Sequence, residues 1–262
     1  MGNTSTIIPL SDLIINADDF GLNSSVNKAI VESFNNEFIN STTLLANRSG
    51  FEEAVELAHK HNITAKIGIH LALTEGQPLT SNKLIREYYN DNEHDNDYAD
   101  IKMHKRKLFF LSKIGKEIIY NEFAAQIMKV RNAGIQITHI DTHHHIHESL
   151  SVTQIILTLL KKYNIPSMRI LNNLNRSTRF YKSGYRIIIN RMIKLYGVNY
   201  SDFLGNQLEA IRQLEQDPTF FKSKKLEIMV HPDFNKDGII IDRIRNSEVN
   251  FDNVKIFTNH SI

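Results

Sequence analysis

Short apolar runs alternate with amphipathic segments along most of the chain, and each run is followed by turn residues. The first run, residues 13–16, is suited to a buried strand, and the sequence Ala-Asp-Asp-Phe-Gly at 17–21 interrupts it as a turn. Asn23 and the serines after it offer N-caps for a helix with a regular apolar face. The same criteria predict strands at 42–45, 66–73, 135–141, 167–171 and 226–230, and helices at 51–60, 117–133, 151–163 and 186–196.

This alternation predicts a parallel α/β arrangement. The 262 residues contain no internal repeat and no low-complexity linker, so we expect a single domain over residues 1–262. Residues 74–100 are polar and read as a long surface insertion after a strand. No apolar run is long enough to span a membrane, and the first ten residues do not resemble a signal peptide, so a cytoplasmic protein is expected.

Composition narrows the chemistry that the chain can perform. It has 31 Lys and Arg against 29 Asp and Glu, and a formal charge of +2 gives no reason to expect a nucleic-acid or membrane partner. With no cysteine, the chain has no thiol nucleophile and no disulfide, and any metal would be held by histidine and carboxylate. Twelve histidines make such a site plausible.

Ionisable residues recur where the predicted strands end. Asp18 and Asp19 follow the first strand, His70 and His143 lie at the ends of two others, and His231 follows the last. The carboxyl ends of parallel strands are where catalytic groups gather in barrels and open α/β sheets. Taken singly, each histidine is explained as well by a hydrogen-bonded core position, and the two aspartates by a helix-capping turn.

Five of the twelve histidines lie between residues 139 and 147. If the strand continues through this segment, His139, Asp141, His143 and His145 share one face. Imidazole suits zinc, manganese or iron, and Asp141 is placed to orient a metal-bound histidine from behind. A polar loop that happens to be rich in histidine is the alternative.

Four ordered motifs resemble those of the YdjC/ChbG family of carbohydrate deacetylases. They are Asn-Ala-Asp-Asp-Phe-Gly-Leu at 16–22, Gly-Ile-His-Leu at 68–71 with the residues after it, the histidine-rich segment 138–147, and the strand ending in His231-Pro232. The resemblance covers about residues 12–235 and rests on the order of the motifs as well as on their residues.

The resemblance implies a distorted TIM-barrel-like (β/α) barrel of the glycoside hydrolase/deacetylase type, and a hydrolase that removes the N-acetyl group from an amino sugar or a chitobiose-like oligosaccharide. By position, Asp19, His70 and His143 would hold one divalent cation, which the resemblance gives as Mg²⁺. Ligand softness favours Zn²⁺ or Mn²⁺ for such a ligand set. Asp18 would be the general base and His231 the general acid, while Asp141, His145 and His147 would contact substrate or support the ligands. A homodimer is expected by the same analogy.

Two parts of the chain depart from the family pattern, namely residues 81–100 and residues 239–262, where the usual closing helix is not recognisable. Two other functions stay open. A metal-dependent phosphoesterase would use two ions and the additional histidines, and a catalytically silent sugar-binding protein would keep the site without turnover.

Overall fold

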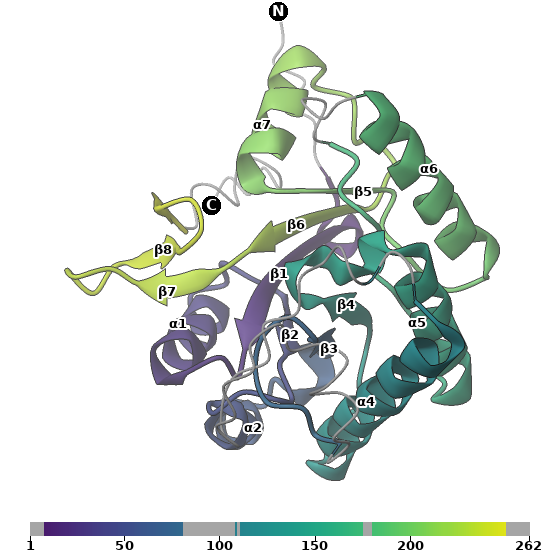
Figure 1. Cartoon of the computed structure of the whole chain (residues 1–262). Helices are drawn as coiled ribbons and strands as arrows, with labels where there is room; N and C mark the ends of the chain where they lie inside the picture. The colour runs from purple at the N-terminus through teal and green to yellow at the C-terminus, as the bar shows by residue number, and fades with distance from the viewer. Residues whose placement is uncertain (1–7, 81–107, 109–110, 175–179, 250–262) are drawn as a thin grey trace, which may run out of the picture.

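The computed structural model describes residues 8–80, 108, 111–174 and 180–249. Six parallel strands form one sheet in the order β4-β3-β2-β1-β6-β5. Their bounds are β1 Leu13–Phe20, β2 Ser41–Leu44, β3 Ile67–Leu71, β4 Ile140–Thr142, β5 Phe203–Gly205 and β6 Leu226–Val230. The sheet curls into a half-barrel with helices on its outside, so the TIM-barrel-like α/β fold is confirmed (Figure 1).

Several of the helices begin directly after a residue whose side chain caps the first turn. α1 Ser24–Asn35 is capped by Asn23, α4 Lys113–Asn132 by Ser112, and α5 Leu150–Lys162 by Ser149. The others are α2 Phe51–Lys60, α6 Phe180–Leu195 and α7 Gln207–Gln216, with 3₁₀ turns η1 Leu10–Asp12, η2 Thr64–Lys66 and η4 His143–Glu148. No helix in the described ranges is both long enough and apolar enough to cross a membrane.

The wall of the barrel between β4 and β5 is built differently from the strand expected at 167–171. The segment pairs through isolated bridges, Ile140 with Met168 and Ser167 with Asn199, and forms no regular strand. Backbone hydrogen bonds from Ile140 N to Ser167 O and from Arg169 N to Ile140 O nevertheless hold it beside β4. This irregular segment therefore brings the side chain of Arg169 into the barrel.

A small antiparallel sheet replaces a regular closing element after β6. Its strands are β7 Pro232–Phe234, β8 Ile240–Asp242 and β9 Ser247–Glu248, in the order β7-β8-β9. It continues directly from the carboxyl end of β6 and packs against α1 (Figure 1). Of the insertion expected at 74–100, residues 81–100 lie outside the described residues, as do residues 250–262.

β1 is longer than its apolar pattern indicates. The strand was expected to end at residue 16, but it runs to Phe20 and contains both aspartates. Its pairing with β2 changes register between Ala17 and Phe20, and Asp19 has a left-handed backbone with φ of 72°. Successive side chains of a regular strand point to opposite faces, so this irregularity is what lets Asp18 and Asp19 serve one site.

Candidate active site

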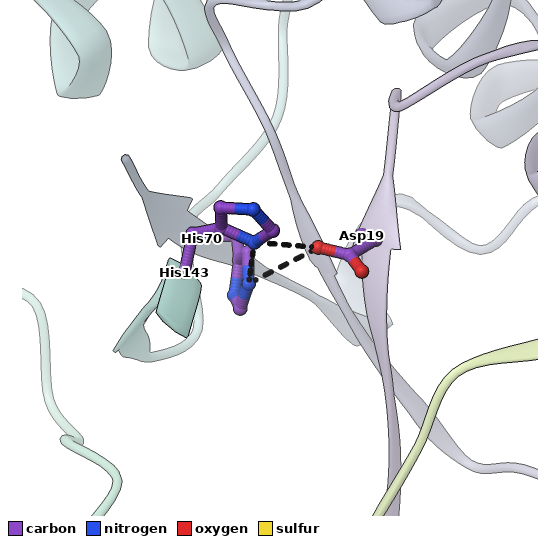
Figure 2. Close-up of side chains that lie close together, drawn as sticks. All are labelled: Asp19, His70 and His143. Carbon is purple, nitrogen blue, oxygen red and sulfur yellow. Dashed lines mark hydrogen bonds and ion pairs between the residues drawn. The ribbon is translucent and has the colours of Figure 1, made fainter. Parts of the chain in front are cut away.

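Asp19, His70 and His143 converge at the carboxyl ends of β1, β3 and β4 (Figure 2). Asp19 Oδ1 lies 3.3 Å from His70 Nε2 and 2.9 Å from His143 Nδ1, and the two ring nitrogens are 3.3 Å apart. We call these three residues the inner triad. All three are buried, so their polar atoms face one another rather than water.

The orientation of His70 is fixed from behind by Asp141. His70 Nδ1 lies 2.6 Å from Asp141 Oδ1, and Thr43 Oγ1 donates to Asp141 Oδ2 at 3.1 Å. The hydrogen bond at Nδ1 leaves Nε2 directed at Asp19, which is how a carboxylate prepares a histidine to bind a metal. Burial opposes a positive charge on His70, but Asp141, Asp19 and Asp18 outweigh it and raise the pKa of His70 to about 10.

The charges around the triad fit a divalent cation. Four buried carboxylates, those of Asp18, Asp19, Asp141 and Glu227, are paired with two guanidinium groups, those of Arg169 and Arg243. The four carboxylates exceed the two guanidinium groups by two negative charges. His70, whose pKa is raised, holds a proton and offsets part of this excess.

The ligand atoms fit as well. Asp19 Oδ1 is buried and makes no well-oriented hydrogen bond with any described residue. Ligands of a tetrahedral zinc ion with bonds of about 2.0–2.1 Å lie about 3.3 Å apart, close to the separations seen here. Two imidazoles and one carboxylate suit zinc, manganese or a similar ion.

Asp18 is held by an arginine that the sequence analysis missed. Arg169 Nη2 and Nη1 each lie 2.7 Å from one of the two carboxylate oxygens, and Asn16 Nδ2 donates to Asp18 Oδ1 at 2.9 Å. Burial alone would raise the pKa of Asp18, but Arg169, with His70 and His231, holds it well below its usual range. Asp18 is therefore ionised throughout the neutral range and fixed in one orientation.

Arg169 connects the site to the interior of the barrel. It is 1% exposed, and it also contacts Asp141 Oδ2 at 2.6 Å and Glu227 Oε1 at 2.6 Å. One guanidinium thus positions the carboxylate expected to act as base and the carboxylate that orients His70. Its signal in the sequence was a single charge inside an apolar run, Ser-Met-Arg-Ile-Leu at 167–171.

His231 approaches Asp18 from β6. Its Nε2 lies 3.8 Å from Asp18 Oδ2 and its Nδ1 lies 3.9 Å from Asp242 Oδ2, both too long for direct hydrogen bonds. His231 lines a cavity of about 420 Å³ together with both aspartates and the two histidines of the inner triad. The structure therefore brings together six of the eight predicted site residues around one cavity, these five and His145.

The histidine-rich segment does not continue as a strand, so the expected shared face is wrong. β4 ends at Thr142, and the chain turns through η4, with φ of 54° at His144 and 53° at His145. Inside the turn, the Thr142 hydroxyl forms a hydrogen bond with His147 Nδ1 at 2.5 Å. The turn redirects the side chains that a strand would have aligned with His139 and Asp141.

The other two histidines predicted for the site, His145 and His147, lie in different environments. His145 lines the cavity, whereas His147 is fully buried beside Thr142 and is not among the lining residues. Burial, reinforced by Arg169, lowers the pKa of His147 to about 4, so its ring is neutral at neutral pH. Asp141 is fully buried behind His70.

The small antiparallel sheet adds a second arginine to the site. Arg243 Nη2 contacts Asp19 Oδ2, and the backbone N–H of Arg243 donates to the carbonyl of His231 at 2.9 Å. Asp19 is thereby held through Oδ2 and presents Oδ1 to the histidines. No sequence signal marked Arg243, because it lies in the segment that departs from the family pattern.

The fold and the site together define a class, namely α/β barrel proteins with an Asp/His cluster at the carboxyl ends of parallel strands. A model of the YdjC-like protein family matches residues 12–258, and the chain belongs to that family. A carbohydrate deacetylase of Clostridium beijerinckii is 38% identical over 182 residues, covering 67% of this chain and 69% of the relative. One from Enterococcus faecalis is 32% identical over 248 residues, covering 90% and 88%.

A solved structure agrees with the fold. A crystal structure from Enterococcus faecalis, described as a cellobiose-phosphate cleavage protein, matches with a TM-score of 0.68 at 27% identity. The match covers 93% of this chain and 92% of the other. The resemblance of the four motifs to the YdjC/ChbG family is therefore confirmed over nearly the whole chain.

Proposed function

We propose that this protein is a metal-dependent carbohydrate deacetylase that hydrolyses the N-acetyl group of an amino sugar and releases acetate. The observation that carries the proposal is the inner triad beside a paired acid and base, Asp18 and His231, in one cavity. The shared name of the curated relatives supports the same enzyme class, a hydrolase of sugar amides.

Asp19, His70 and His143 would hold the cation. A divalent cation there supplies polarisation of the acetyl carbonyl and a lowered pKa for a water molecule. Asp141 keeps Nε2 of His70 directed inward, and Arg243 occupies the second oxygen of Asp19 so that one oxygen remains for ligation.

Asp18 would accept the proton of the attacking water. Arg169 keeps it ionised and oriented, at the cost of lowering its basicity. His231, which follows the neighbouring strand β6 and lines the same cavity, would give its proton to the departing sugar nitrogen. Because Asp18 Oδ2 and His231 Nε2 are 3.8 Å apart, one would take a proton from the water that attacks the carbonyl carbon while the other gives a proton to the nitrogen bonded to that carbon.

The sugar is proposed at the level of class, as an N-acetylated mono- or oligosaccharide. The direct test is release of acetate from N,N′-diacetylchitobiose, with and without a chelator and with the cation restored. Parallel measurement of phosphate release from an aryl phosphate separates the phosphoesterase alternative. Chelator-sensitive acetate release supports the proposal, whereas phosphate release without acetate release contradicts it.

A further inference from the structure

A second group of metal-binding side chains lies on the cavity wall outside the inner triad. Glu75 Oε2 is 3.6 Å from His143 Nε2, and Glu75 Oε1 is 3.7 Å from His144 Nε2. The three ligand atoms lie within 4.8 Å of one another. We call Glu75, His143 and His144 the outer triad; it shares His143 with the inner triad and uses the opposite nitrogen of that ring.

The chain builds this arrangement at an energetic cost. His144 has φ of 54°, in the left-handed region that non-glycine residues seldom adopt. The turn places the His144 ring against that of His143, with centroids 3.9 Å apart. Thr74 Oγ1 lies 2.8 Å from His144 Nδ1, and when that nitrogen donates to the hydroxyl, Nε2 keeps its lone pair toward Glu75.

Exposure increases from the inner triad to the outer one. The side chains of Asp19 and His70 are each 2% exposed and that of His143 is 10% exposed, whereas those of Glu75 and His144 are 38% and 43% exposed. His143 thus stands between buried ligands and ligands in contact with solvent. A cation arriving from solvent meets Glu75 and His144 before it meets Asp19.

The chemistry of imidazole decides how the two triads are related. A neutral ring has one lone pair, so His143 binds a cation through Nε2 or through Nδ1, but not through both at once. While Nε2 binds, the ring proton is on Nδ1. For Nδ1 to bind instead, that proton leaves to solvent and Nε2 takes one from solvent, which it can then donate in a hydrogen bond to Glu75. The two sites are therefore successive rather than simultaneous.

We propose that the outer triad is an entry site through which a divalent transition-metal cation is loaded into the inner triad. This inference rests on the proposed metal-dependent function. The acidic group that attracts the ion is Glu75, whose present cationic neighbour, Arg48, is at 3.9 Å with both side chains partly exposed. The cavity arginines 243 and 245 face Asp19 and Asp242 instead.

The test is the rate at which chelator-stripped protein takes up Co²⁺ or Zn²⁺, measured by stopped flow, with the equilibrium Kd measured by calorimetry. Glu75→Gln and His144→Asn should each slow uptake by about tenfold, the lower end of electrostatic steering effects. Cation release should slow to a similar degree, so that Kd is nearly unchanged. Asparagine is chosen because it tolerates the left-handed backbone.

Two controls match these variants. Glu52→Gln removes the same charge from an exposed position on α2, and His59→Asn replaces an exposed histidine on the same helix, away from the cavity. Both should load at the wild-type rate. If Glu75 only oriented the inner ligands, Glu75→Gln would raise the equilibrium Kd. A raised Kd in this variant would overturn the entry site.

Other outcomes are equally decisive. Unchanged uptake rates in both outer-triad variants, or two ions per chain at saturation, would overturn the entry site and leave the proposed deacetylase standing. Wild-type protein that binds no divalent cation would overturn both proposals.

Discussion

At the residue scale, the site depends on two adjacent aspartates with different partners. Asp18 is paired with Arg169, and Asp19 is directed at two histidines. Burial and an adjacent carboxylate normally raise the pKa of a carboxyl group, but here Arg169 outweighs them for Asp18, and His143 and His70 outweigh them for Asp19. This division is what allows one of them to act as a base and the other as a ligand.

The proton-transfer roles predict large losses of rate. Asp18→Asn and His231→Ala should each lower kcat at least about a hundredfold, because a positioned acid or base contributes about 10²–10⁴-fold. Acetate release under saturating substrate measures the effect, and cation binding by calorimetry checks that the inner triad is intact. Near-wild-type kcat in either variant would refute that residue's role.

The contacts of Arg169 predict that replacing it will change both the free energy of unfolding and the pH dependence of kcat. Arg169→Met leaves Asp18, Asp141 and Glu227 without their shared cation, so the free energy of unfolding should fall by about 3–5 kcal/mol. Without Arg169, burial raises the pKa of Asp18, so the acidic limb of the kcat profile should move to higher pH. Denaturant unfolding and a pH series measure the two effects.

Arg169→Lys is the matched control for charge. It keeps one positive charge but loses the two-point contact with Asp18, so both effects should be smaller. An unchanged acidic limb in Arg169→Met would show that Arg169 does not act on the base.

At the element scale, the irregular end of β1 positions Asp19 for the site. The turn after it requires Gly21, with φ of 88°, where a Cβ atom would lie 2.9 Å from the carbonyl oxygen of Leu45. The Gly21 N–H donates to Asn27 Oδ1 at 2.7 Å, which ties the turn to α1. The position of Asp19 therefore depends on a glycine two residues away.

Gly21→Ala should lower the free energy of unfolding by at least about 2 kcal/mol, because backbone strain and a backbone collision act together. Gly197→Ala is the control, since Gly197 has φ of 80° but open space around it, and should cost only about 1–2 kcal/mol. Chemical denaturation compares them. Equal losses in the two variants would contradict the steric part of the explanation.

Particular elements show how far the sequence could be interpreted. The apolar runs predicted five of the six strands of the sheet, and the strand-end positions of Asp19, His70 and His143 predicted their convergence. The bulge in β1 and the turn at His144 and His145 could not be predicted, because they reverse local backbone preferences and depend on tertiary contacts. Arg169 was missed because its three carboxylate partners come from distant segments.

At the scale of the whole molecule, buried charge couples stability to pH and to the cation. With His70 at a pKa of about 10 in the cation-free protein, against about 6.5 when unfolded, its protonation stabilises the fold fully below pH 6.5. This stabilisation is lost as pH rises through about 10. In chelator, the free energy of unfolding should fall over that range, and His70→Gln should remove much of the dependence.

The cation should also stabilise the fold by mass action. At about 100 times Kd it adds about 2.7 kcal/mol, which corresponds to a rise in Tm of roughly 5–10 °C for a chain of this size. Asp19→Asn should abolish most of this rise. Calorimetric scans with chelator and with cation measure it, and an equal rise in the variant would place the cation elsewhere.

The most direct test of the central claim is a titration of metal-free protein with Zn²⁺ or Mn²⁺ while acetate release from N,N′-diacetylchitobiose is measured. We predict that the rate rises from near zero and saturates at one ion per chain, and that Asp19→Asn stays near zero throughout. Full activity in protein verified to be metal-free, or wild-type activity in Asp19→Asn, would contradict the assignment of Asp19, His70 and His143 as the catalytic metal site.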